Sequence, residues 1–280
     1  MKNLSYSFIL LVVLFASACN TTKYVPENEY LLNKVSIASD NKSITKEETK
    51  TYIRQLPNAA VFGLFKLQLG LYNLSGSDST KWWNRFWKRV GDEPVIYNPQ
   101  LTSVTENQIS QLFRNRGYMN AEVNSDISHP KEKIAEVTYN IKSNIPYRIR
   151  SYSVNINYPE LLQIALDTAR SLIKHGNLFD SDVLDDERDR ITSRFRNLGY
   201  YNFSKDYLQY YADSTLNTNE ADLVLEVRNE SELTDSIDLV KVFQKYTIRK
   251  VHFYSETEKT LENLNSEISL DSLEIENDKF

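Results

Sequence analysis

Carboxylates gather at one point of the sequence, and histidines occur at three separate points. Asp182, Asp185, Asp186 and Glu187 are close enough in sequence to act as a general acid and base or to bind a cation. The pattern around them, however, predicts the first turns of a helix, where carboxylates are stabilised by the helix dipole. The histidines, at positions 129, 175 and 252, lack the spacing of metal ligands. We therefore predict that the chain is not an enzyme and holds no metal or other cofactor.

Cys19 is the only cysteine of the chain, and its setting predicts a covalent modification. It follows Ala16-Ser17-Ala18, small residues that resemble a bacterial lipobox, and an apolar run at 8–15 that is too short to span a bilayer. We predict that residues 1–18 are a signal peptide, that Cys19 carries palmitate or a similar lipid, and that residues 19–29 are a tether. The alternative is an ordinary secretory signal that ends near Ala18 and leaves Cys19 as a free thiol.

The charge of the chain argues against one class of partner. The net charge is −5 and the cations form no basic stripe, so nothing predicts a nucleic-acid interface. With 41% hydrophobic and 25% charged residues, the composition is typical of a folded globular chain.

An eight-residue motif occurs twice and organises the rest of the sequence. Phe113-Arg114-Asn115-Arg116-Gly117-Tyr118-Met119-Asn120 returns at 195–202 with six identical positions. Each copy predicts the end of a helix, a glycine stop and an outgoing strand. Gly117 and Gly199 are expected to be structural, with positive φ just beyond the helix. Tyr118 and Tyr200 are expected to begin the strands.

A second repeat marks the start of each unit. Tyr30, Tyr147 and Tyr246 each open a segment with the period-two alternation of a half-buried strand. Together the two repeats predict tandem units of β-α-α-β-β order. We expect the elements of the first unit at 30–37, 45–55, 102–116, 119–127 and 134–141, and those of the second at 147–154, 159–174, 181–198, 200–211 and 221–227.

The two units differ in length because the first has an insertion between its helices. We place one unit at 30–144, with the helix–helix insertion at about 57–98, a second unit at 145–230 and an incomplete third unit at 245–280. The third unit is expected to lack a second helix, a glycine and closing strands, so residues beyond Tyr254 should be almost unprotected in hydrogen exchange. The predicted fold class is α+β, with each unit a three-stranded sheet covered by two helices.

Three tryptophans, Trp82, Trp83 and Trp87, stand in the insertion. One interpretation is that they pack the insertion against its own domain. The other is that they contact a partner protein or a membrane interface, because aromatic side chains are enriched in both settings. The sequence leaves both interpretations open.

A β-α-α-β-β unit repeated behind a lipobox resembles the POTRA domain, the polypeptide-transport-associated module. The chain is similar to the translocation and assembly module lipoproteins of Bacteroidota, which are lipidated relatives of the barrel assembly factor BamA. The segments that carry the resemblance are 23–27, 30–35, 71–74, 82–87, 91–97, 116–123 and 146–151. The chain departs from this family in one respect, because nothing after Tyr254 offers the strands of the family's membrane barrel.

The resemblance implies a periplasm-facing scaffold that is anchored to the outer membrane by lipid and binds unfolded outer-membrane proteins or assembly partners. It also places the strand after each glycine at a sheet edge, where an extended peptide can add a strand. The partner-binding residues would then be Tyr118, Asn120, Val123, Tyr200, Asn202 and Phe203. Two alternatives stay open: a second edge that is blocked by its neighbour or blunted by Lys205 and Asp206, and a stand-alone lipoprotein scaffold that handles no clients.

Overall fold

The computed structural model describes residues 21–60, 66–167, 169–215, 218–228, 243–252, 268–270 and 273–276. The predicted signal peptide, Cys19 and residues 61–65 of the predicted insertion lie outside this part of the chain. The chain forms two compact units. The first comprises Met1–Arg148, Leu178–Asp182 and Leu216–Glu220, and the second comprises Ile149–Asn177, Val183–Thr215 and Ala221–Phe280.

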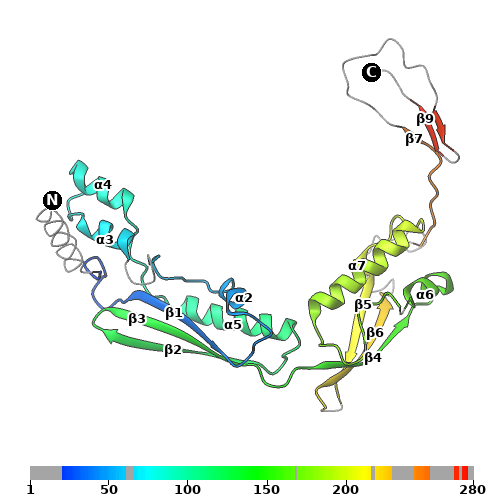
Figure 1. Ribbon diagram of the computed structural model, residues 1–280, viewed down its shortest axis with the longest axis horizontal. Helices are drawn as coiled ribbons and strands as arrows, with labels where there is room; N and C mark the ends of the chain where they lie inside the picture. The colour runs from blue at the N-terminus through cyan, green and yellow to red at the C-terminus, as the bar shows by residue number, and fades with distance from the viewer. Residues whose placement is uncertain are drawn as a thin grey trace, which may run out of the picture. The chain divides into compact units, whose positions relative to one another are not determined.

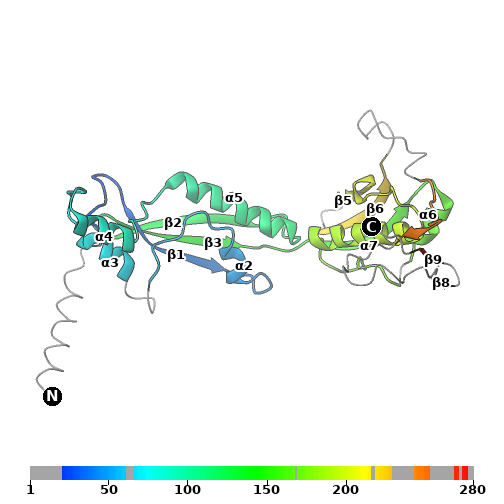
Figure 2. The same ribbon diagram turned by 90° about the horizontal axis from the view of Figure 1, so that it is seen from above.

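The first unit contains a three-stranded sheet with helices along one face (Figure 1). Its strands are β1 (Leu31–Ser39), β2 (Glu122–Lys131) and β3 (Ile134–Lys142). They lie in the order β1-β3-β2, with β1 parallel and β2 antiparallel to β3. The helices are α2 (Lys46–Lys50), α3 (Leu67–Leu74), α4 (Trp82–Val90) and α5 (Pro99–Asn115). In both views α5 runs along the sheet, while α3 and α4 form a helical hairpin near the start of β1 (Figure 2).

The spacing of apolar residues explains why this sheet has one buried face. Every second residue of β3 is buried, as expected for a strand that faces helices on one side only. Residues of α5 at helical spacing are buried against the same cluster. Among them Phe113 has no exposed surface, and full burial of an apolar side chain contributes about 1.5–3 kcal/mol.

The second unit repeats this topology. Its strands are β4 (Arg148–Asn155), β5 (Leu208–Asp213) and β6 (Glu220–Val227), in the order β4-β6-β5, with β5 antiparallel to β6. Its helices are α6 (Pro159–Ala165), α7 (Ser181–Asn197) and the short 3-10 helix η1 (Lys205–Tyr207). Apolar residues of both long helices meet those of β5 and β6 in one core. The two units together confirm the predicted fold class, a mixed α+β chain of three-stranded sheets and helices.

The C-terminal segment corrects one expectation. The strands β7 (Val251–His252), β8 (Ile268–Leu270) and β9 (Leu273–Glu276) pair in the order β7-β9-β8, with β7 parallel and β8 antiparallel to β9. The closing strands that we expected to be missing are therefore present in short form. Apolar and polar residues alternate within 268–270 and 273–276, which is the period of strands that expose one face.

Three helices differ in length from expectation, each for a local reason. α5 begins at Pro99 rather than Thr102, because the Asn98 side chain accepts the N–H of Gln100 and proline suits the first helical position. α2 ends at Lys50 rather than Gln55, where the Thr51 hydroxyl donates to a carbonyl of the last turn. α6 ends at Ala165 rather than Lys174, because the chain after it is bonded to α7 instead. No helix within the described ranges combines the length and the apolarity needed to cross a membrane.

Both copies of the repeated motif end their helix with the same hydrogen bonds. Gly117 has a φ of +91° and Gly199 a φ of +104°. The N–H of each glycine donates to the carbonyl three residues earlier, and the N–H of the next tyrosine donates to the carbonyl five residues earlier, which is a Schellman motif. The carbonyl of each glycine then accepts the N–H of the tyrosine that opens the next repeat, Tyr147 at 2.8 Å and Tyr246 at 2.7 Å.

Tyr118 and Tyr200 do not begin strands, contrary to expectation. Both side chains are buried, and their rings lie 5.9 Å and 6.3 Å from those of Phe113 and Phe195. This contact is the hydrophobic pair that often accompanies a Schellman motif. The chain therefore passes through the core before β2 begins at Glu122 and β5 at Leu208.

Candidate functional site

One edge strand of each sheet is covered at its start. The segment before α5 covers β1, and the segment before α7 covers β4; we call α5 and α7 the second long helix of their units. Beside β1, Leu32 N–H donates to the Val95 carbonyl and Tyr97 N–H to the Tyr30 carbonyl, both at 2.8 Å. Beside β4, Ile149 N–H donates to the Asn177 carbonyl, also at 2.8 Å. The strands at the opposite edges, β2 and β5, are therefore the candidates for adding a partner strand.

β2 presents an edge of ten residues. The N–H of Ser125 donates to the carboxylate of Glu106 on α5 at 2.6 Å, so it points away from β3. Because N–H groups alternate in direction along a paired strand, those of Val123 and Ile127 also point away from β3. Val123 packs partly on the core, whereas Ile127 is 40% exposed. The edge thus has outward donors on both sides of one that is already occupied.

β5 presents a shorter edge that is also partly occupied. The Tyr207 carbonyl accepts the N–H of Arg228 at 2.8 Å, so the Tyr207 carbonyl points towards β6. Because backbone groups alternate in direction along a strand, the N–H and carbonyl groups of Leu208 and Ala212 point away from β6. The Leu208 carbonyl accepts a hydrogen bond from the Arg188 guanidinium of α7 at 3.2 Å. Ala212 lies in the exposed second half of the strand.

Only one of the six predicted partner-binding residues, Val123, lies on an edge strand. The other five precede the strands and are Tyr118, Asn120, Tyr200, Asn202 and Phe203. Phe203 is fully buried, with its ring 4.7 Å from that of Phe195. The edge placement of these five was wrong because the helix-stop motif directs the chain into the core before each strand begins.

Lys205 and Asp206, which we considered as residues that blunt the second edge, lie on η1 rather than on β5. The Lys205 ammonium binds Asp185 at 2.9 Å and Asp189 at 3.0 Å, and these carboxylates raise the pKa of Lys205. The cation that reaches the β5 backbone is Arg188, which sequence reasoning missed.

Helix α4 exposes most of its aromatic side chains. Trp82 is 68% exposed, Trp83 50% and Phe86 46%, whereas Trp87 is half-buried. The Trp83 ring lies 5.3 Å from those of both Trp82 and Trp87 and is stacked on that of Phe86 at 6.1 Å. Residues 81–90 include four cations and no carboxylate. α4 is therefore a basic amphipathic helix whose apolar side faces solvent.

Close backbone packing joins α3 and α4. A Cβ at Gly91 would lie 2.2 Å from the Tyr72 nitrogen, so this crossing requires glycine. The buried Asn84 side chain accepts the N–H of Gly76 at 2.8 Å and donates to the Asp78 carbonyl at 2.7 Å. Sequence reasoning singled out neither residue, although a glycine directly after a helical run is a usual sign of a helix end.

The residues just after the predicted lipid anchor are bound to this hairpin. The Lys23 ammonium donates to the carbonyls of Asn73 and Ser75, both at 2.8 Å. The Tyr24 hydroxyl donates to the same Ser75 carbonyl, and its ring meets that of Tyr72 edge-on with centroids 5.5 Å apart. Residues 23 and 24 are thus fixed against α3.

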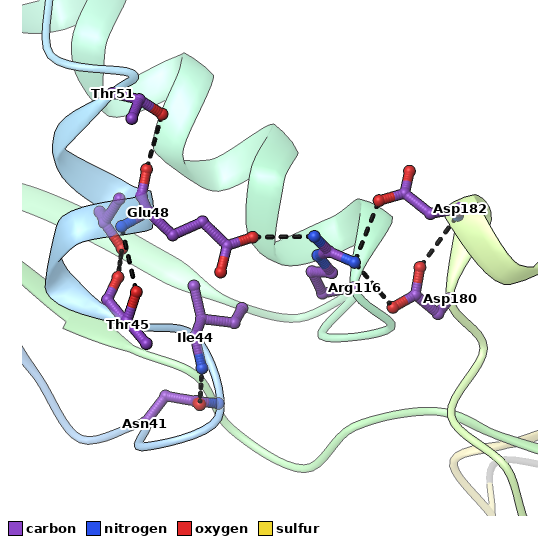
Figure 3. A network of polar contacts seen from close by, with 9 residues as sticks. Asn41, Ile44, Thr45, Glu48, Thr51, Arg116, Asp180 and Asp182 are labelled. Atoms are coloured by element: carbon purple, nitrogen blue, oxygen red, sulfur yellow. Dashed lines mark hydrogen bonds and ion pairs between the residues drawn. The ribbon is translucent and has the colours of Figure 1, made fainter.

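The predicted acidic cluster is divided among separate cations. Figure 3 shows Arg116 between Glu48 of α2 at 2.8 Å, Asp180 at 3.3 Å and Asp182 at 3.0 Å. The hydrogen bond that Arg116 donates to Glu48, together with the two aspartates, raises the pKa of Arg116. Asp185 pairs with two other cations, Arg188 and Lys205. Of the four predicted carboxylates only Asp182 lies in the first turn of α7.

Glu187 has a different environment, because it is fully buried. Its carboxylate accepts two hydrogen bonds from the Arg190 guanidinium at 2.8 Å and one from the Ser171 hydroxyl at 2.9 Å. Tyr152 and Tyr210 lie in the same core, where burial raises the pKa of both hydroxyls and the Glu187 charge adds to the shift. Every described partner of this carboxylate belongs to the second unit, which indicates a structural role.

The histidines do not converge on a site. His129 Nδ1 lies 3.2 Å from the Ile134 carbonyl, and His175 Nδ1 lies 2.7 Å from the Arg150 carbonyl. The side chain of His252 lies outside the described residues. In the part of the chain that the structure describes, no group of three His, Cys, Asp or Glu side chains could hold a metal ion.

Comparisons with known proteins identify one part of the chain. Residues 30–144 match the POTRA family, described as a surface antigen variable number repeat. A comparison with curated proteins gave no match. Among solved structures, the chain is similar to POTRA3-5 of BamA from Haemophilus influenzae, with 14% identity and a TM-score of 0.38 over 85% of this chain and 76% of that chain.

Two further solved structures are similar. POTRA1-2 of the periplasmic domain of Omp85 from Anabaena has 11% identity and a TM-score of 0.33, over 73% of this chain and 99% of that chain. CdiB from Escherichia coli has 9% identity and a TM-score of 0.28, over 77% of this chain and 30% of that chain. The sequence match covers residues 30–144, the part of the chain whose elements follow the β-α-α-β-β order of the first unit.

Proposed function

We propose that the chain is a non-enzymatic periplasmic scaffold of outer-membrane protein assembly or translocation. In this role it receives extended segments of unfolded outer-membrane proteins, or of partner proteins, as an added strand on β2. The POTRA match over residues 30–144 supports the scaffold role. The ten-residue edge of β2, with outward donors at Val123 and Ile127, is the observation that carries the binding role.

Backbone pairing suits a scaffold with many clients. Main-chain hydrogen bonds to an added strand read little sequence, and barrel proteins consist of alternating strands of about the same length as β2. The affinity should be weak, because a short added strand buries little area and must be ordered on binding.

Lipid attachment at Cys19 is part of the same proposal. It is supported by the small residues before Cys19 and by the absence of a second cysteine in the sequence. We propose that acylated Cys19 is the first residue of the mature protein, which holds the domain at the periplasmic face of the outer membrane. Mass spectrometry of the purified N-terminal peptide checks this, and an unmodified thiol at Cys19 would refute it.

The test of strand addition removes one outward donor at a time. Ile127→Pro deletes an N–H that points away from β3, so it should leave the β2–β3 pairing intact and weaken binding of a barrel-derived strand peptide several-fold. Binding is measured from the amide resonances of β2 during titration. Unchanged affinity in Ile127→Pro and in Val123→Pro would exclude this mode of binding.

Two matched variants at the occupied donor control the test. Ser125→Pro removes an N–H that Glu106 already holds, so it should affect peptide affinity less than Ile127→Pro does. Glu106→Ala frees that N–H for the incoming strand and should strengthen binding. An equal loss in Ser125→Pro and Ile127→Pro would mean that the prolines distort the strand rather than delete a donor.

A stand-alone lipoprotein scaffold that handles no clients is the second candidate. The observation in its favour is that a charged side chain of the second long helix occupies a backbone group on each edge, Glu106 on β2 and Arg188 on β5. Such caps are one way in which proteins protect sheet edges. If barrel-derived peptides bind only after both caps are removed, this second function holds.

A further inference from the structure

The exposed face of α4 has no role in strand addition, yet it gathers several exposed aromatic side chains. Trp82, Phe86, Val90 and Trp83 are each 45–68% exposed. At 3.6 residues per turn, these four side chains fall within an arc of about 100°. A contiguous exposed apolar face of this kind on a helix is typical of a protein or membrane interaction site.

We propose that this face binds an anionic lipid surface, with the aromatic side chains at the level of the headgroups and the neighbouring cations on lipid phosphates. The proposal deepens the membrane attachment proposed above by adding a second contact that is built from protein. In this arrangement α4 lies in the plane of the membrane interface and does not cross the bilayer.

The charge of the helix matches an anionic surface. Lys81, Arg85 and Arg89 are exposed and lie together on the arc beside the aromatic face. The fourth cation, Lys88, is half-buried, with its ammonium 5.8 Å from the centroid of the Tyr24 ring. The helix is thus strongly basic although the chain carries a net charge of −5. Helices with tryptophan on one face and arginine or lysine on the other are typical of membrane surfaces.

The chain itself keeps α4 close to the predicted anchor. Lys23 and Tyr24 are bonded to the end of α3, and α3 packs on α4. Lys23 follows Cys19 by four positions, and a step of four extended residues spans at most about 14 Å. An acylated Cys19 would therefore hold the hairpin within reach of the headgroups. A single acyl chain binds membranes only marginally, so a second basic and apolar contact would add to the anchoring.

The tryptophans make the proposal directly measurable. All three tryptophans of the chain lie on α4, so tryptophan emission, excited selectively over tyrosine, reports on this helix alone. A chain that begins at Asn20 keeps every residue that the structure describes and lacks Cys19, which separates the helix contact from the acyl anchor. With phosphatidylglycerol vesicles, its emission should shift to the blue and be quenched by brominated acyl chains. With phosphatidylcholine vesicles, neither change should occur.

Charge reversal and aromatic loss should each weaken the contact. One basic residue at an anionic surface contributes about fivefold to binding, so Arg85→Glu with Arg89→Glu should weaken it at least about 25-fold. Trp82→Ser with Phe86→Ser should remove the quenching of the remaining tryptophans. The matched controls are Lys42→Glu with Lys142→Glu, the same charge change at exposed sites of the first unit, and Tyr201→Ser, an exposed aromatic residue of the second unit.

Three results would overturn the proposal. The first is unchanged emission on every vesicle, even if the acylated protein sediments with them, since lipid anchoring would then stand without α4. The second is equal binding of the charge-reversed variant and its control. The third is an emission shift that depends on protein concentration in the absence of lipid, which would make this face a contact between copies of the chain. Conversely, if brominated phosphatidylglycerol quenches the tryptophan emission of the chain that begins at Asn20, the proposal is supported even if Cys19 proves to be unmodified.

Discussion

The two β-α-α-β-β units have the same topology but hold it together with different chemistry. In each unit the second long helix is bonded to the chain that follows the first helix. In the first unit Thr105 accepts the N–H of Arg54 at 3.1 Å. In the second unit Glu187, at the matching helical position, accepts the N–H of Leu172 at 3.0 Å. Both Thr105 and Glu187 are fully buried, so a hydroxyl and a carboxylate serve the same backbone contact.

The carboxylate needs further partners, which the hydroxyl does not. Burying an ionised group is costly unless it is paired and hydrogen-bonded. Glu187 is accordingly paired with Arg190, whose side chain is 19% exposed, and with Ser171. Thr105 completes its hydrogen bonding by donating to the Leu101 carbonyl of its own helix. The comparison teaches that the fold specifies a hydrogen-bond acceptor at this place but not its charge.

A second pair of matching positions shows the same contrast. Across β1 and β3, the Asn33 side chain donates to Glu136 at 2.7 Å. Across β4 and β6, the Arg150 guanidinium forms an ion pair with Asp222. The second unit therefore depends on charge at two places where the first uses a neutral donor or acceptor.

The largest effect is expected at Glu187. Glu187→Ala would leave the half-buried Arg190 cation without its carboxylate and the Leu172 N–H without its acceptor. Breaking a buried ion pair by removing one partner costs about 3–5 kcal/mol, and the partial exposure of Arg190 favours the lower value of about 3 kcal/mol. Chemical denaturation measures the loss of unfolding free energy.

A double exchange tests whether the two chemistries are interchangeable. Glu187→Thr with Arg190→Gln gives the second unit the residues found at the matching positions of the first, Thr105 and Gln108. We expect the double variant to lose at least about 1 kcal/mol less unfolding free energy than Glu187→Thr alone, because it also removes the cation that would be left unpaired. Equal losses in the single and double variants would show that the charge pair is not what distinguishes the units.

Substitution of the helix-stop glycines, Gly117 and Gly199, is expected to have the next largest effect on unfolding free energy. The two substitutions should differ in size. A side chain at positive φ costs about 1–2 kcal/mol. A Cβ would also lie 2.6 Å from the Tyr246 carbonyl oxygen at Gly199, but 3.0 Å from that of Phe179 at Gly117. Gly199→Ala should therefore lower the unfolding free energy more than Gly117→Ala does. Thermal unfolding of both variants checks the order, and a variant as stable as the parent protein would contradict the helix-stop role.

The smallest effect is the pH dependence of the Arg150–Asp222 pair in the second unit. Hydrogen bonds from Arg150 and then Ser151 lower the pKa of Asp222 to about 2. Because the folded-state pKa lies below the unfolded value of about 3.9, this pair stabilises the fold above pH of about 4, and the contribution is lost as pH falls towards 2. Hydrogen exchange of β6 amides across this range should show the loss, and Asp222→Asn should reduce the pH dependence of this exchange. Glu136→Gln is the matched control in the first unit, and an equal change there would contradict the contrast.

Sequence reasoning succeeded where one local rule decided the structure. The repeated motif placed the ends of α5 and α7 within a residue, because a glycine after an apolar helical run has few other uses. The sheets with one buried face followed from period-two alternation, as in β3 and β6.

One failure arose where a local side-chain contact outweighed a residue preference, and the others arose where contacts distant in sequence decide the outcome. Tyr118 and Tyr200 were assigned to strands because tyrosine favours strands. Their ring contacts with Phe113 and Phe195 instead hold both tyrosines in the core before the strands begin. The end of α6 depends on Glu187, which follows much later in the chain, so no local pattern could reveal it. The edge caps Glu106 and Arg188 are ordinary exposed-face helix residues in the sequence, and only the fold brings them to a strand backbone.

The pairing of Val95–Tyr97 with the start of β1 has a consequence for how the first unit accommodates its insertion. The chain is fixed on both sides of the α3–α4 hairpin, by β1 before it and by this pairing after it. The insertion about doubles the length of chain between these two points relative to the second unit, and a doubling of loop length costs only about 0.6 kcal/mol of closure entropy. The hairpin also supplies its own packing at Gly91. The chain between β1 and Val95 is therefore a site that tolerates insertions. The length and sequence of this segment can change while the sheet, its register and its edges stay as they are.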